Sequence, residues 1–199
     1  MIKTLSQSSI TNDIKYTSMS AGNIPSSEYL IETALLSGST SFADFDVSTL
    51  SSTYRHFQIV FVGRTARAAG TDPLMIRFNS ESSAVYSSHS MSGLGSGTPG
   101  STFHSTITTW ILAADAIGNA IGDSNRVSNA IIDILDPFDP NKFTTIRGLA
   151  GMSGSDDPRT VILTSGAWRK TDPVTTIRVM TFSGSNFLNN SRISLYGVV

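Results

Sequence analysis

The chain has 199 residues, no cysteine, 15% charged residues and a formal net charge of −1 at pH 7. This length suits one domain with a sizeable core, and the missing cysteines exclude disulfides, cysteine-based zinc sites and thiol nucleophiles. No basic stripe of the kind that duplex-binding proteins carry is present, so we expect no nucleic-acid partner. The longest apolar stretches are too short to cross a membrane, and the N-terminus lacks the apolar region of a signal peptide. We therefore expect no membrane contact either.

Residues 1–28 differ in composition from the rest of the chain. Their apolar residues stand singly and without a period among Ser, Thr, Asn and Lys, and Pro25-Ser26-Ser27 closes the segment. Such a segment cannot bury enough apolar surface to fold alone. Two interpretations stay open: a frayed terminus, or an extended anchoring arm that becomes ordered on a partner. In the second interpretation the partner-binding residues are the larger apolar ones, namely Ile2, Leu5, Ile10, Ile14, Tyr16 and Ile24.

Short strand patterns begin at residue 29. Residues 54–64 alternate in character and place Phe57, Ile59 and Phe61 on one face, which is typical of a half-buried strand. Further strand patterns lie at residues 29–36, 42–47, 74–79, 103–113, 159–168, 175–182 and 191–198. The Gly- and Ser-rich residues 91–101 predict a mobile loop, and residues 113–117 are compatible with a helical turn.

Residues 126–151 contain the clearest strand–loop–strand pattern. An apolar run at 130–135 and a β-branched run at 143–149 flank the sequence from Asp136 to Asn141, which contains two prolines. Prolines and turn-forming residues exclude a continuous helix or strand there. Together with the other patterns this predicts roughly nine or ten strands and almost no helix. The expected fold is all-β, an antiparallel β-sandwich of jelly-roll type over residues 29–199.

No residue spacing is typical of a catalytic or metal site. His56, His89 and His104 are tens of residues apart or in separate strands, without the spacing of a zinc site. The glycines at 93–97 lack the lysine and the following helix of a phosphate-binding loop, and no serine stands in a nucleophile elbow. We therefore expect no enzymatic activity, no cofactor and no metal.

Three aspartates leave a minor alternative. Asp133, Asp136 and Asp139 are three residues apart, whereas a calcium-binding loop places its ligands at alternate positions. Asp136 and Asp139 each precede a proline, so turn formation explains them. A calcium site stays open as the less favoured interpretation.

Several segments resemble a structural module of tailed-bacteriophage virion proteins. They recur in order over residues 29–199 and match in strand and turn sequence, not in a catalytic signature. The segments are Tyr54–Ile59 with Gly63–Thr65, Arg77–Ser80 with Tyr86–His89, Ala130–Asp136 with Asn141–Arg147, Ser165–Arg169, and Ser191–Gly197. The resemblance implies a non-enzymatic virion protein with a β-sandwich fold that forms a symmetric oligomer.

The short N-terminal segment favours one virion role over another. A fibre tip hangs on a long Ser- or Thr-rich shaft, whereas a capsid-decorating protein needs only a compact body and an arm. We therefore expect a homotrimeric decoration (cement or head-spike) protein that is assembled in the host cytoplasm and lies on the capsid surface. Its arm would bind the major capsid protein. The alternative is a tail-fibre or baseplate-associated protein that binds a receptor or glycan through Tyr86, Trp168 and the loop at 91–101.

Overall fold

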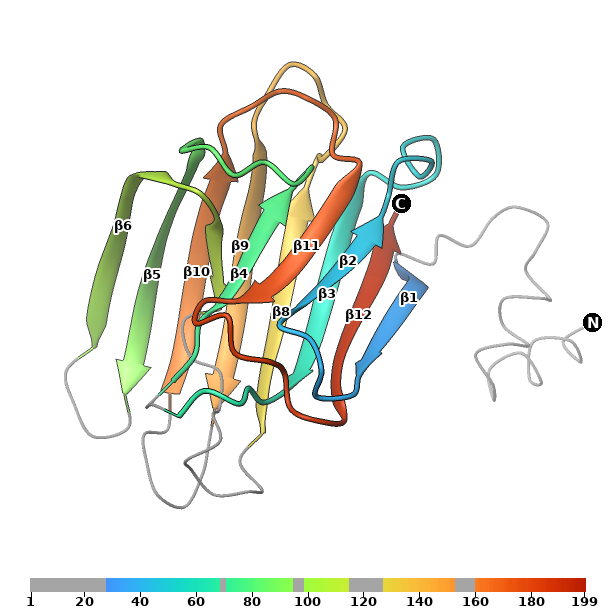
Figure 1. Cartoon of the computed structure of the whole chain (residues 1–199). Coiled ribbons are helices and arrows are strands. Elements are labelled where there is room, and N and C mark those ends of the chain that lie inside the picture. The colour runs from blue at the N-terminus through green and yellow to red at the C-terminus, as the bar shows by residue number, and fades with distance from the viewer. Residues whose placement is uncertain (1–27, 69–70, 95–98, 115–126, 153–159) are drawn as a thin grey trace, which may run out of the picture.

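The structure is a computed structural model that describes residues 28–68, 71–94, 99–114, 127–152 and 160–199. Within these ranges all regular structure is β, in two antiparallel sheets that pack face to face (Figure 1). The large sheet has the order β1 (Glu28–Leu36), β12 (Ser191–Val198), β3 (His56–Gly63), β8 (Ser128–Leu135), β9 (Thr144–Met152), β10 (Thr160–Trp168), β5 (Tyr86–Leu94), β6 (Gly100–Thr108). The small sheet has the order β2 (Phe42–Asp46), β11 (Thr176–Thr181), β4 (Leu74–Phe78), β7 (Ile111–Ala114).

Eight of these strands have the order of a jelly roll. Strands β1, β12, β3 and β8 form one half, and the small sheet of β2, β11, β4 and β7 forms the other. Two hairpins are inserted into this framework: β5–β6 between β4 and β7, and β9–β10 between β8 and β11. Both hairpins extend the large sheet beyond β8, which makes it twice as wide as the small one. The predicted β-sandwich of jelly-roll type is confirmed.

The inserted β5–β6 hairpin corrects one expectation. Residues 91–94 and 100–101, predicted as part of a mobile loop, belong to β5 and β6. Their Ser- and Gly-rich sequence lacks an apolar pattern, but β10 supplies a continuous antiparallel ladder to the whole of β5. Likewise Ala113 and Ala114 lie in β7 and not in a helical turn, because β4 pairs with Leu112 and Ala114 on either side of an irregularity at Ala113. The rest of that expected turn, residues 115–117, lies outside the described residues.

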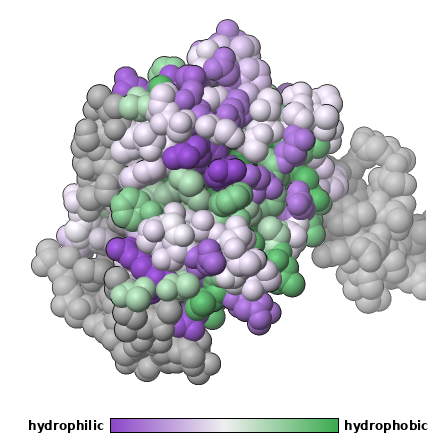
Figure 2. Space-filling model, in the orientation of Figure 1, coloured by the Kyte–Doolittle hydropathy of each residue, from purple (hydrophilic) through white to green (hydrophobic). Residues whose placement is uncertain are grey.

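The core fills the space between the two sheets. Phe57, Ile59 and Phe61 point into it and are fully buried, as the alternation at residues 54–64 predicts. The largest fully buried side chains come from both sheets and from the connections between them: Trp168, Tyr86, Phe45, Phe57, Phe61, Phe78 and Phe187. Figure 2 views the molecule from the side of the small sheet, where hydrophilic and hydrophobic side chains are mixed.

Candidate functional site

The small sheet covers only one face of the large sheet. We call the opposite face, formed by the residues that alternate with the core residues, the outer face. Strands β8, β9 and β10 show this alternation clearly, with a buried residue followed by an exposed or half-buried one along each strand. In a soluble antiparallel sheet the solvent side normally carries polar side chains.

A row of apolar side chains crosses the outer face instead. Strand register places Val60 opposite Ile131, Ile131 opposite Leu149, Leu149 opposite Leu163 and Leu163 opposite Met91. We call these five residues, on β3, β8, β9, β10 and β5, the apolar row. Its members at Ile131, Leu149, Leu163 and Met91 are 45%, 49%, 50% and 55% exposed. This contiguous apolar surface makes the outer face a candidate for contact with another molecule.

Polar residues lie beside the apolar row. One step along the same five strands, register aligns Gln58, Asp133, Arg147, Ser165 and His89. The Asp133 carboxylate accepts hydrogen bonds from Gln58 Nε2 at 2.9 Å and from Arg147 Nε at 2.7 Å. The charges next to the apolar row are therefore already paired within one chain.

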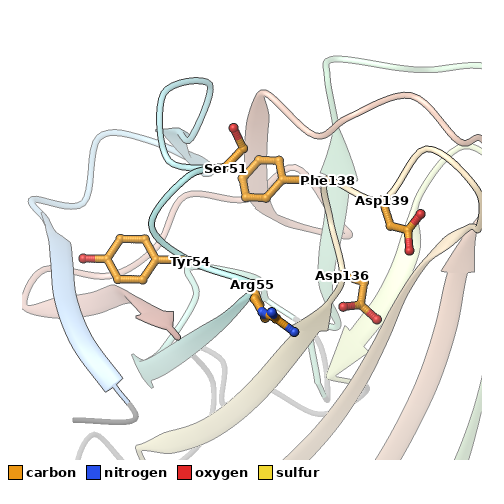
Figure 3. A pocket seen from close by; sticks show the side chains of 6 residues that line it. All are labelled: Ser51, Tyr54, Arg55, Asp136, Phe138 and Asp139. Atoms are coloured by element: carbon orange, nitrogen blue, oxygen red, sulfur yellow. The ribbon is translucent and has the colours of Figure 1, made fainter. Parts of the chain in front are cut away.

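A second candidate is a pocket at one end of the sandwich, which we call the end pocket (Figure 3). It has a volume of about 230 Å³ and is formed by the β2–β3 and β8–β9 connections. Its lining residues are Ser51, Tyr54, Arg55, Asp136, Phe138 and Asp139.

The aromatic walls of the end pocket are held by the core. The Tyr54 ring packs directly against Gly197, because a Cβ added at Gly197 would lie 2.5 Å from the ring. The Phe138 ring meets the buried Phe57 ring edge-on, with 5.6 Å between centroids. Phe57 also contacts Tyr54, at 6.3 Å, so both walls rest on one buried side chain. The pocket is therefore largely pre-formed.

The acidic side of the end pocket belongs to a charged turn. Lys142 forms ion pairs with Asp136 and, at 3.5 Å, with Asp139. A hydrogen bond from the Asn141 backbone N–H lowers the pKa of Asp139, and the Asp136 carboxylate raises the pKa of Lys142. The Asp136 backbone N–H donates to His56 Nδ1 at 3.0 Å, which leaves the proton of a neutral imidazole on Nε2. Asp139 and Lys142 are thus ionised at neutral pH.

The glycan-contact residues expected from the sequence are part of the core. Tyr86 and Trp168 are 0% and 1% exposed, and their rings stack with 6.5 Å between centroids. The Tyr86 hydroxyl accepts from the Phe78 backbone N–H and lies 3.2 Å and 3.1 Å from the Phe78 and Glu81 carbonyl oxygens. Burial raises the pKa of Tyr86 to about 12. This placement corrects the expectation, because neither ring has a face at the surface for a ligand.

The other expected residues are distributed as follows. The arm residues Ile2, Leu5, Ile10, Ile14, Tyr16 and Ile24 lie outside the described residues. Asp133 lies on the outer face beside the apolar row, whereas Asp136 and Asp139 line the end pocket, so the three carboxylates do not converge. Within the described part of the chain, no group of three His, Cys, Asp or Glu side chains is placed to hold a metal ion. Nor does that part contain a helix long and apolar enough to cross a membrane.

Sequence reasoning missed both candidate sites. The strand sequences contain a signal for the apolar row. Ile131, Leu149 and Leu163 are apolar residues at positions that the alternation assigns to the solvent-facing side of the strands. Their alignment into one row depends on strand order and register, which alternation does not determine. The end pocket lies between two connections that are about 80 residues apart in the sequence, a separation given by the hydrogen bond from the Asp136 backbone N–H to His56 Nδ1. No local pattern in the sequence could therefore show it.

Comparisons with known proteins add little. No family model matches the chain, and no curated protein matches it. Among solved structures, the chain is similar to the CBM2 module of an evolved Dit of Lactobacillus casei BL23 phage J-1, with 12% identity and a TM-score of 0.25. The alignment covers 79% of this chain and 68% of that one.

Proposed function

We propose that this chain is a non-enzymatic structural protein of a tailed-bacteriophage virion, a homotrimer that decorates the capsid surface. Its N-terminal arm binds the major capsid protein, and the β-sandwich forms the body of the decoration. The observation that carries the proposal is the apolar row on the outer face, because exposed apolar surface of this extent serves contact between proteins. The sequence resemblance to virion modules over residues 29–199 supports the same role.

The arm supplies the anchoring energy in this proposal. Ordering a disordered segment on a partner costs roughly 2–5 kcal/mol or more of the gross interaction energy. Burial of side chains such as Ile2, Leu5 and Ile10 contributes about 1.5–3 kcal/mol each when complete. Four or five such side chains therefore offset the ordering cost and leave net affinity for the capsid.

Localisation on intact particles tests this function. Strand β1 begins at Glu28, so a variant without residues 1–27 keeps every described strand. We expect electron cryo-microscopy to show density for the full-length chain on the capsid lattice. The truncated chain should keep its circular dichroism spectrum and oligomeric mass but lose particle binding. Density confined to the tail or baseplate, or full capsid occupancy by the truncated chain, would contradict the proposal.

The end pocket favours a second candidate function, recognition of a host-surface glycan. A volume of about 230 Å³ is below that of drug-sized pockets and has room for a single sugar ring. The Tyr54 and Phe138 side chains provide apolar surface, while Arg55 and the two carboxylates provide donors and acceptors for hydroxyl groups.

Titration of purified protein with host-surface polysaccharide tests the second candidate. Arg55→Ala and Phe138→Ala should each weaken binding by about tenfold or more, since they remove a charged donor and an aromatic wall. Phe143→Ala is the matched control, because Phe143 lies in the same β8–β9 connection, is 48% exposed and does not line the pocket. Equal binding by all three variants would exclude the pocket as the glycan site.

A further inference from the structure

We infer that the outer face is the contact between copies of this chain, with the apolar row at the centre of the buried surface. The inference rests on the proposed function and names the partner that covers the face, a neighbouring subunit of the homo-oligomer. It concerns described residues only and is independent of the arm.

The size of the outer face matches a stable subunit contact. Eight strands at about 4.8 Å spacing, each of about eight residues at 3.4 Å, give a face of roughly 900 Å². Stable protein interfaces bury about 800 Å² on each partner. The face is therefore large enough for a stable complex without help from the sandwich edges.

The composition of the outer face matches the anatomy of an interface. Apolar residues stand at its centre, where the row crosses β8, β9 and β10, and Val161 at 58% exposure extends the row on β10. Polar residues stand on one side, and Arg192 lies further out, on β12. An apolar centre that is depleted of charge is typical of protein–protein interfaces, and Leu35, which pairs with Arg192, adds exposed apolar surface at the β1 edge.

The charges on the outer face favour a second copy of the chain as the molecule that covers it. Asp133 and Arg147, the charged residues nearest the apolar row, form an ion pair within the chain at 2.7 Å. The centre of the face therefore has no net charge that would attract a partner of opposite sign, and two copies of it do not repel each other. A site for an oppositely charged partner would need unpaired charge at this position.

Lysines in the apolar row test the inference on the full-length chain. Wild-type protein should have about three times the 21.2 kDa mass of one chain in light scattering after size exclusion. Leu149→Lys/Leu163→Lys should fall to the mass of one chain, because the two charges that each chain would bury in the contact are not compensated. Phe182→Lys is the matched control, since Phe182 is 51% exposed but follows β11 of the small sheet. The control should keep the wild-type mass.

Thiol labelling provides a second readout that does not require a disrupted interface. The chain has no cysteine, so Leu163→Cys and Phe182→Cys each introduce a single thiol, at positions 50% and 51% exposed in one chain. In the oligomer a maleimide should react at least about tenfold more slowly at position 163 than at position 182, in proportion to the rare opening of the contact. The difference should disappear on dilution to the monomer.

Several results would overturn the inference. A monomeric wild-type chain, an unchanged mass for the double lysine variant, or equal labelling of both thiols would each do so. If the chain is monomeric and the thiol at position 163 still reacts slowly, but reacts faster once residues 1–27 are removed, the N-terminal segment covers the outer face instead of a second copy. A wild-type dimer that the lysines dissociate would support the face contact and contradict the trimer. The subunit contact and the capsid role can therefore fail separately.

Discussion

Tyr86 and Glu81 show how single residues fix the connection between β4 and β5. The buried Tyr86 hydroxyl contacts the backbone of Phe78 and Glu81, and the Glu81 side chain pairs with Lys170 beyond the end of β10. The Lys170 ammonium, followed by the Ser83 hydroxyl and backbone N–H, lowers the pKa of Glu81 from 4.5 to about 2. The ion pair thus joins two strand ends that are far apart in sequence.

The depressed pKa of Glu81 predicts an acid-sensitive contribution to stability. The folded state holds Glu81 ionised while the unfolded state takes up a proton near pH 4.5, so this contribution is present above pH 4.5 and is lost as the pH falls towards 2. Urea unfolding between pH 2 and 6 should show a smaller loss of stability for Glu81→Gln than for wild type. Glu32→Gln, an exposed carboxylate on β1, controls for the removed charge. Parallel curves for wild type and Glu81→Gln would contradict the role of the pair.

At the scale of elements, the contact of β7 with the inserted hairpin β9–β10 joins the two sheets. The Thr164 hydroxyl donates to the Ala113 carbonyl oxygen at 2.7 Å. Gly148 lies beneath the same carbonyl, and a Cβ at Gly148 would be 2.4 Å from its oxygen and 2.5 Å from Thr164 Oγ1. Backbone from one sheet therefore lies directly on the other, without a side chain between them.

This close approach predicts a strong effect of one methyl group. Gly148→Ala should lower the free energy of unfolding by about 1–3 kcal/mol, because the added Cβ meets a backbone carbonyl that cannot move without displacing β7. Gly93→Ala, also in a strand of the large sheet, is the matched control, since nothing lies within 4 Å of a Cβ there. Chemical denaturation of both variants measures the difference. Equal stability of the two variants would mean that β7 moves away freely.

At the scale of the whole molecule, the jelly roll is a platform with one covered and one uncovered sheet face. The inserted hairpins widen the large sheet, and three of the five residues in the apolar row, Leu149, Leu163 and Met91, lie on them. A four-stranded jelly-roll sheet that ended at β8 would carry only Val60 and Ile131 of the row. The insertions therefore create most of the proposed contact surface.

Coupling between folding and assembly follows from that surface. If neighbouring copies cover the outer face, the melting temperature of the wild-type chain should rise with protein concentration, because the folded state is stabilised by mass action. The melting temperature of Leu149→Lys/Leu163→Lys should be lower and independent of concentration. Calorimetry over a hundredfold range of concentration measures both. A wild-type melting temperature that does not change over this range would contradict an assembly that contributes to stability.

The amino-acid sequence by itself determined the fold class and most strands, because alternation and turn residues are local properties. Strand β3 (His56–Gly63) lies within the strand predicted at residues 54–64, and β12 (Ser191–Val198) matches the one predicted at 191–198. Pro137 and Pro140 lie between β8 and β9, where no strand continues. The Ser- and Gly-rich strand β5 was not predicted, since pairing with β10 and β6 forms it, and the single strand predicted at residues 103–113 is divided between β6 and β7.

Only the tertiary structure decided which residues share a surface. The aromatic character of Tyr86 and Trp168 is the same in the core and at a binding site, so composition could not show that both are buried. Val60, Ile131, Leu149, Leu163 and Met91 come from five strands and meet only because the register aligns them. A change of one residue in register would turn each of these side chains from the outer face into the core. The contact surface is therefore a property of strand pairing, which no single segment of the sequence contains.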